Sequence, residues 1–255
     1  MLNNNSIHLY QKFKQGVRLP YDILNIPDGA KQGNFIEIHC GGFGSEISPH
    51  PIEKNQFYAL TDRGPNTTYD VNGDKGKIFL VPNYTPKIGL FKLQEDGSIQ
   101  KLKEILLKNP YGKPITGLPN QHFGATKEIA YDQHGKVLEQ GTDEYGLDAE
   151  GLVALNDGTF WVSDEYGPHI VHFNADGVEI DRINAYPKDS RRISGNLLPI
   201  EFANRRQNRG MEGLTITPDQ KTLVGIMQST MSNPDVSVTK SDLVRIVMIN
   251  LENKE

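Results

Sequence analysis

The sequence predicts an all-β protein, a β-propeller built from four-stranded antiparallel blades. Three observations favour this class: few apolar-periodic segments are long enough to be helices, turn dipeptides are frequent, and one segment recurs three times. The copies occupy residues 44–66, 148–168 and 210–230. Each has a glutamate, an alternating apolar strand, a polar turn, a second apolar strand and a polar exit, so each copy is interpreted as a β-hairpin.

The turns of the second and third copies have different strengths as hairpin signals. The second copy turns at Asn156-Asp157-Gly158, and Asp-Gly is a strong hairpin signal because both residues tolerate positive φ. The third copy turns at Pro218-Asp219-Gln220, with Gln220 where glycine is expected, which weakens the signal there.

Further strands are predicted after each hairpin. Third strands are expected within residues 87–98, 169–178 and 242–253, and fourth strands within 99–108 and 178–187. Four antiparallel strands in a meander describe a propeller blade, whereas two facing sheets, a β-sandwich, are the alternative. The third copy has no predicted fourth strand.

Three segments separate or precede the copies. Residues 109–146 contain either a degenerate blade, with a hairpin at 127–140, or a long functional loop. Residues 184–209 are predicted to be an irregular basic insertion. Residues 34–44 are predicted to include a strand that could complete another blade.

Composition excludes several classes of protein. With 255 residues, 36% of them hydrophobic, the chain can bury a core in one or two domains. A net charge of −5 argues against a nucleic-acid surface, and Cys40 alone cannot form an internal disulfide. No apolar run reaches membrane-spanning length, and Met1–Asn5 shows no secretion signal, so we expect a cytoplasmic protein or a sequence without its signal.

Carboxylates are predicted to gather at one end of the blades. Antiparallel pairing places the start of one strand beside the end of the next, so residues equidistant from a turn should face each other. Because innermost strands surround a propeller axis, the three strand ends should converge. The pairs defined in this way are Glu46 with Asp62, Glu150 with Asp164, and Glu212 with Gln228.

An all-oxygen set of this kind predicts a hard cation, because several close carboxylates repel unless a positive charge accompanies them. Ca²⁺ is preferred to Mg²⁺, since calcium accepts six to eight oxygens in loose geometry. Zinc is disfavoured because no His/Cys cluster accompanies the set. The alternative is that each residue caps a turn or pairs with an arginine. The predicted metal ligands are Glu46, Asp62, Glu150, Asp164 and Glu212.

Three further residues are predicted to take part in chemistry. Arg63 follows Asp62 and Arg209 precedes the third glutamate, and arginine grips phosphate or carboxylate well. Both could equally be salt-bridge partners of nearby acids. Glu165 is the expected general base, since it neighbours the carboxylates without occupying a paired position. No G-x-S-x-G or P-loop motif is present.

The motifs "LTDRGPN" (60–66), "DAEGLVALNDGTFWVSDEYGP" (148–168) and "NRGMEGLTITPDQKTLVGIMQS" (208–229) resemble the bacterial phytase-like proteins, described as having esterase-like activity of phytase. The resemblance extends from about residue 34 to the C-terminus. It implies a β-propeller, export from the cytoplasm, and hydrolysis of esters or phosphoesters.

This sequence departs from the family in one respect. Family members continue with further strands after the third motif, whereas this chain stops at "MINLENKE" (248–255). We therefore expect an N-terminal segment at 1–33 and a phytase-like domain at 34–255 that is either truncated, with its C-terminal blades missing, or an incomplete ring. Three to four blades of about six would be present.

The function predicted from these observations is Ca²⁺-dependent hydrolysis of phosphate or carboxylate esters. A non-catalytic binding propeller with a structural axial cation is one alternative. A lactonase of the gluconolactonase type is the other, with Asn66 or Asn196 as an extra ligand. The expected partner is a small anionic ester, and a monomer is expected.

Overall fold

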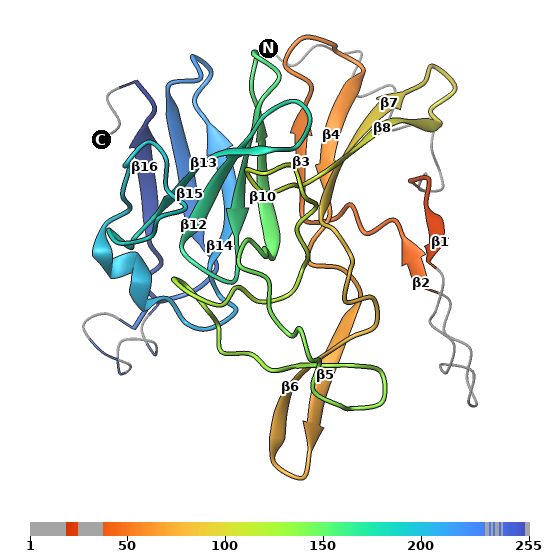
Figure 1. Ribbon diagram of the computed structural model, residues 1–255. Coiled ribbons are helices and arrows are strands. Elements are labelled where there is room, and N and C mark those ends of the chain that lie inside the picture. Colours follow the sequence, from red (N-terminus) through yellow and green to blue (C-terminus); the bar gives the residue numbers. More distant parts are fainter. Residues whose placement is uncertain are drawn as a thin grey trace.

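The computed structural model describes residues 19–24, 38–232, 235, 237, 240 and 242–252. The regular elements of these residues are β-strands with only short 3₁₀ segments, among them η1 (Ile200–Asn204), which confirms the all-β prediction (Figure 1). Across the same residues, no helical segment has the length and apolar character that a bilayer crossing requires.

Three antiparallel sheets reproduce the predicted meanders, and we call them the first, second and third blades. Two have four strands and the third has three, as the repeats predicted. The first blade is β3 (Glu46–Pro49), β4 (Gln56–Leu60), β7 (Lys87–Leu93) and β8 (Ile99–Leu106). The second is β10 (Ala149–Ala154), β11 (Phe160–Asp164), β12 (His169–Phe173) and β13 (Glu179–Asn184). The third is β14 (Met211–Ile216), β15 (Thr222–Met227) and β16 (Ile246–Asn250).

The blades succeed one another with their first strands adjacent (Figure 1). Strand β10 contacts both β3 and β14. One apolar core lies between the first and second blades and includes Leu60 and Val162. A second core lies between the second and third blades and includes Trp161 and Leu223. This succession is that of propeller blades and not of two facing sheets.

Both predicted turns form, including the one without glycine. Gly158 adopts a φ of 83° and Gln220 a φ of 58°, so Gln220 occupies the left-handed region in place of glycine. The Gln220 side chain compensates by accepting a hydrogen bond of 3.0 Å from the backbone N–H of Asn156, which ties the turn of the third blade to that of the second.

A hairpin that the sequence analysis did not predict is inserted between β4 and β7. It consists of β5 (Asn66–Val71) and β6 (Asp74–Phe79), and it projects away from the blades at the bottom of Figure 1. Its turn, Asn72-Gly73, has φ values of 54° and 93°. Asn-Gly is a strong hairpin signal, so the sequence did contain the information.

The insertion at 109–146 is mostly loop and forms no four-stranded blade, but the hairpin expected within 127–140 forms over a few residues, where Asp132 N–H donates to Lys136 O at 2.8 Å and Leu138 N–H to Ala130 O at 2.9 Å. Its one named strand is β9 (Ala130–Tyr131), which pairs in parallel with β6, and a single bridge joins Tyr131 to Val137. The strand expected within 34–44 exists as β2 (Ile38–Cys40), but it pairs with β1 (Asp22–Leu24) and joins none of the described blades. Residues 1–18 and 25–33 of the predicted N-terminal segment lie outside the described residues.

Candidate metal and active site

Strands β10 and β14 both begin with a β-bulge at a glutamate. Ala149 pairs with Asp164 and Gly151 with Ser163, so Glu150 has no partner in the ladder. In the third blade, Met211 pairs with Met227 and Gly213 with Ile226, which leaves Glu212 in the same position. A bulge redirects the side chain of the extra residue. The predicted pairing of Glu150 with Asp164 is therefore shifted by one residue.

The glycine after Glu150 is required by close packing. A Cβ at Gly151 would lie 2.4 Å from Ser163 Oγ and 2.7 Å from Leu214 Cβ, closer than real contacts allow. The backbone of the second blade thus approaches the third blade directly beside the glutamate. The Ser163 hydroxyl accepts a hydrogen bond from Gly151 N–H and donates one to Met211 O, both at 2.9 Å, which secures this approach.

Three carboxylates converge at this end of the second blade, and we call Asp148, Glu150 and Glu165 the acidic cluster. One carboxylate oxygen from each lies within 4.8 Å of the others. Glu150 and Glu165 were expected near this point, as ligand and base respectively. Asp148 was not predicted, although it stands two residues before Glu150 in the same repeat.

Burial makes the ionised forms of this cluster costly. Burial, reinforced by the nearby Asp148 and Glu212 carboxylates, raises the pKa of Glu150 to about 8. Burial is also the main cause that raises the pKa of Glu165 to about 7. The pKa of Asp148 is raised by burial, against the opposing effect of Arg63. Asp148 and Glu165 share a hydrogen bond, so the two carboxyl groups titrate as a pair.

Asp164 lies beside the cluster but is occupied by backbone groups. Its side chain is fully buried and accepts hydrogen bonds from the N–H groups of Asp148, Tyr166 and Gly167 at 2.9, 3.2 and 3.0 Å. Burial raises the pKa of Asp164 to about 6. The carboxylate thereby holds the two segments that carry Asp148 and Glu165 next to each other.

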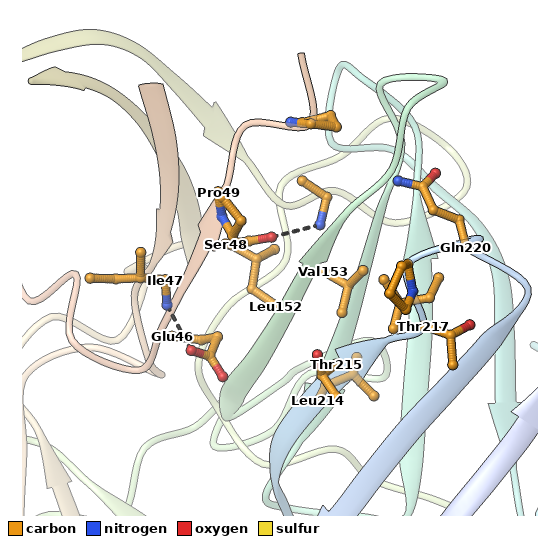
Figure 2. A pocket seen from close by; sticks show the side chains of 14 residues that line it. Glu46, Ile47, Ser48, Pro49, Leu152, Val153, Leu214, Thr215, Thr217 and Gln220 are labelled. Carbon is orange, nitrogen blue, oxygen red and sulfur yellow. Dashed lines mark hydrogen bonds between the residues drawn. The ribbon is translucent and has the colours of Figure 1, made fainter. Parts of the chain in front are cut away.

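Asp62 and Glu46, two other predicted ligands, are not members of the acidic cluster. Asp62 accepts a hydrogen bond of 2.8 Å from Gly64 N–H, and burial raises its pKa. Glu46 pairs with Leu60 and not with Asp62, and its Oε1 accepts a hydrogen bond of 2.9 Å from Ile47 N–H. Figure 2 shows Glu46 beside β10, on the wall of a groove. Glu46 is not among the residues whose oxygens converge in the acidic cluster.

Gln228 connects the third blade to the acidic cluster. Its Nε2 donates a hydrogen bond of 3.2 Å to Glu165 Oε1 and another to Glu212 Oε1. The prediction that Gln228 and Glu212 lie together is therefore met. Arg209 is exposed, and its Nη1 donates a hydrogen bond of 3.4 Å to Gln228 Oε1.

Arg63 is buried among internal partners. Its Nε lies 3.2 Å from Asp148 Oδ2, and its Nη1 lies 3.1 Å from Glu128 Oε1 and 3.2 Å from the Tyr166 hydroxyl. The backbone N–H of Arg63 donates a hydrogen bond of 3.3 Å to Asp148 Oδ1. These contacts match the second interpretation of Arg63, as a salt-bridge partner of nearby acids. Glu128, which comes from the long insertion, had no sequence motif to identify it.

Comparison with known proteins agrees with the motif resemblance. The phytase-like family, described as esterase-like activity of phytase, matches residues 38–255. A protein of Arthroderma benhamiae described as an uncharacterized secreted protein is 32% identical over 232 residues, which cover 76% of this chain and 45% of that protein. This chain thus spans less than half the length of that relative.

Two solved structures show remote likeness. Glutaminyl cyclase from Myxococcus xanthus has a TM-score of 0.31 and 11% identity, covering 80% of this chain and 72% of that one. A putative 6-phosphogluconolactonase from Bacteroides fragilis has a TM-score of 0.30 and 11% identity, covering 91% of this chain and 77% of that one. These low TM-scores give neither likeness weight. On the family match, the chain belongs to the phytase-like family.

Proposed function

We propose that this member of the phytase-like family is a divalent-cation-dependent hydrolase of carboxylate or phosphate esters, with Ca²⁺ preferred to Mg²⁺. One observation carries the proposal: three carboxylates, all with pKa values raised by burial, converge within 4.8 Å. Such a group is costly when ionised and uncompensated, whereas a hard cation with oxygen ligands relieves the repulsion.

The residues present suit such a cation. We propose Asp148, Glu150 and Glu165 as its ligands, with Glu212 as a neighbouring carboxylate from the third blade. Asp62 and Asp164 support the cluster through the turns that they hold. A bound divalent cation would polarise the ester oxygen and lower the pKa of a water molecule beside it.

The predicted roles of the arginines are refined by their contacts. We propose that Arg63 is a positioning residue, because it holds both carboxylate oxygens of Asp148. Arg209 is exposed next to Gln228, and we propose that it contacts the developing negative charge of the substrate. The predicted role of Glu165 as general base is the alternative to its role as ligand. Glu165→Gln loses Ca²⁺ affinity if Glu165 is a ligand and keeps it if Glu165 acts only as a base.

A substrate panel tests the proposal. An aryl acetate, an aryl phosphate and a lactone are each assayed with Ca²⁺ and with an excess of chelator. We expect Ca²⁺-dependent hydrolysis of at least one of them, and loss of that activity in Glu150→Gln. Glu139→Gln is the matched control, since Glu139 is exposed in the long insertion, and it should retain activity. Chelator-insensitive hydrolysis, or full activity of Glu150→Gln, would reject the mechanism.

A structural cation without catalysis is the second candidate, and one observation favours it. The cluster and its neighbours join all three blades: Arg63 follows β4 of the first blade, the cluster belongs to the second, and Glu212 belongs to the third. In that case a chelator lowers the melting temperature, but no member of the panel is hydrolysed with or without Ca²⁺.

An extracytoplasmic location is proposed from the relative described as secreted. Fractionation of producing cells, followed by detection with an antibody, checks it: the protein should be found outside the cytoplasm. The expected monomer and the expected small ester substrate remain predictions of the same proposal.

A further inference from the structure

A groove runs along the first strands of the three blades, β3, β10 and β14 (Figure 2). Its volume is about 320 Å³, which is at the small end of the range for pockets that bind small molecules. Figure 2 shows Ser48 of β3, Leu152 of β10, and Leu214 and Thr215 of β14 around the same space.

The walls of the groove are almost uncharged. Glu46 is the one ionisable side chain among the described residues that line it, and none of these residues is Lys, Arg or His. Two of its polar groups already have partners, because Ser48 Oγ accepts Ala154 N–H and Gln220 Oε1 accepts Asn156 N–H, each at 3.0 Å. A ligand rich in phosphate or carboxylate groups needs cations around it, and this surface offers none.

The groove begins where the acidic cluster ends. Leu152 follows Glu150 by two residues and Leu214 follows Glu212 by two residues, and both are buried side chains of the apolar cores that border the groove. At about 3.3 Å of strand per residue, the apolar wall starts about 7 Å from each of the two glutamates. A small molecule can therefore contact both, with its reactive group at the cluster and an apolar part in the groove.

We infer that the groove binds the uncharged, apolar acyl chain of a carboxylate ester whose ester group lies at the acidic cluster. This inference rests on the proposed function and narrows its substrate class. The buried arginines near the cluster do not alter this chemistry, because Arg63 pairs with Asp148 and Glu128, and Arg205 donates to the carbonyls of Tyr166 and Gly124. The exposed Arg209 beside the cluster is a single cation, and a phosphate group there would lie among several carboxylates that repel it, so phosphoesters are disfavoured.

A chain-length series tests the inference. With Ca²⁺ present, kcat/KM for p-nitrophenyl acetate, butyrate and hexanoate should rise by about fourfold per methylene group while the chain lies in the groove. p-Nitrophenyl phosphate should be the poorest substrate. In Thr215→Arg, which places a cation at an exposed position of the wall, hexanoate hydrolysis should fall by about tenfold more than acetate hydrolysis. Ile52→Arg is the matched control, because Ile52 is exposed but does not line the groove, and it should keep the preference for longer chains.

Binding of uncleavable amides separates this inference from the proposed function. N-phenylhexanamide should bind more tightly than N-phenylacetamide to the wild-type chain, as measured by calorimetry, and Thr215→Arg should remove the difference. If the amides behave in this way and no ester is hydrolysed, the hydrolase proposal fails while the groove assignment stands. Ester hydrolysis without a chain-length preference, or with p-nitrophenyl phosphate as the best substrate, would overturn the inference. An unchanged length preference in Thr215→Arg would also overturn it.

Discussion

The second and third blades share one register but carry different charge. In both, the first two strands pair through a bulge at a glutamate that glycine follows. At three matching positions at the open end of this hairpin, the second blade has an acidic residue, whereas the third blade has none. The equivalent pairs are Asp148 and Gly210, Asp164 and Met227, and Glu165 and Gln228. The alternation of apolar residues therefore determines the blade structure, and a few residues at the open end of the hairpin determine whether carboxylates gather there.

Packing explains part of this difference. A Cβ at Gly210 would lie 2.4 Å from the carbonyl oxygen of Glu165 and 2.6 Å from that of Asp164. The third blade therefore cannot carry an aspartate at the position equivalent to Asp148, because its backbone lies directly against the exit of the second blade. The close contact that leaves no room for a side chain at Gly210 also packs the third blade against the backbone of Asp164 and Glu165 in the second blade.

The largest expected effect is on stability, and it distinguishes Arg63 from Arg209, which the sequence analysis assigned to the same role. Arg63→Met leaves Asp148 and Glu128 without their buried partner, which should lower the free energy of unfolding by about 3–5 kcal/mol. Arg209→Met removes an exposed side chain and should change that free energy by less than about 0.5 kcal/mol. Urea denaturation of both variants measures the difference. Equal losses would contradict the assignment of Arg63 to the interior.

The two bulged glutamates should differ in their effect on calcium. Glu150→Gln removes a member of the acidic cluster and should weaken Ca²⁺ binding by at least about tenfold, or 1.4 kcal/mol. Glu212→Gln should weaken it less, because Glu212 is held by Gln228 outside the closest group. Calorimetric titration of chelator-treated protein measures both affinities, with Glu46→Gln expected to match the wild type. A larger loss of Ca²⁺ affinity in Glu212→Gln than in Glu150→Gln would indicate that the cation lies closer to the third blade.

The raised pKa values predict how stability depends on pH. Glu150 and Glu165 have pKa values of about 8 and about 7, above the usual 4.5, so between these limits the folded chain holds protons that the unfolded chain has lost. Without a cation, stability should therefore decrease as pH rises from about 5 to about 8. Melting temperatures in chelator should fall over this window by several degrees, and saturating Ca²⁺ should remove the fall. A melting temperature that rises with pH in chelator would contradict these shifts.

The smallest expected effect comes from making the third blade more like the second. Gln228→Glu places a new carboxylate between Glu165 and Glu212 and removes two hydrogen bonds to them. Without Ca²⁺ the variant should lose about 0.5–1 kcal/mol of stability, and with Ca²⁺ it should recover that loss and bind the ion more tightly. Thermal denaturation with and without Ca²⁺ measures both changes. A loss that Ca²⁺ does not reverse would indicate that the cation lies elsewhere.

Much of the fold was accessible from the sequence because its signals are local. Alternating apolar residues and Asp-Gly turns predicted the blade hairpins, and even the turn at Gln220 formed. The hairpin at Asn66–Phe79 was missed despite its Asn72-Gly73 turn, because the repeat alignment stopped at its first residue. Glu150, Glu165 and Gln228 were predicted near the site, since strand ends follow from hairpin register.

The rest of the site depends on contacts that register cannot predict. A bulge shifts the pairing around Glu150 by one residue, which turns Asp164 to backbone groups and brings in Asp148. Glu128 reaches Arg63 from a loop 65 residues away in sequence. The first blade has no bulge at Glu46, so its glutamate pairs regularly and lies in the groove wall.

The most direct test of a cation in the acidic cluster is calorimetric titration of Ca²⁺ into the chelator-treated chain at pH 7 in two buffers of different ionisation enthalpy. Because Glu150 is mostly protonated and Glu165 is about half protonated at this pH, binding of a cation to their oxygens must release protons. The account predicts one site per chain and release of about one proton or more, seen as a heat that depends on the buffer. No binding, or binding whose heat is the same in both buffers, would contradict it.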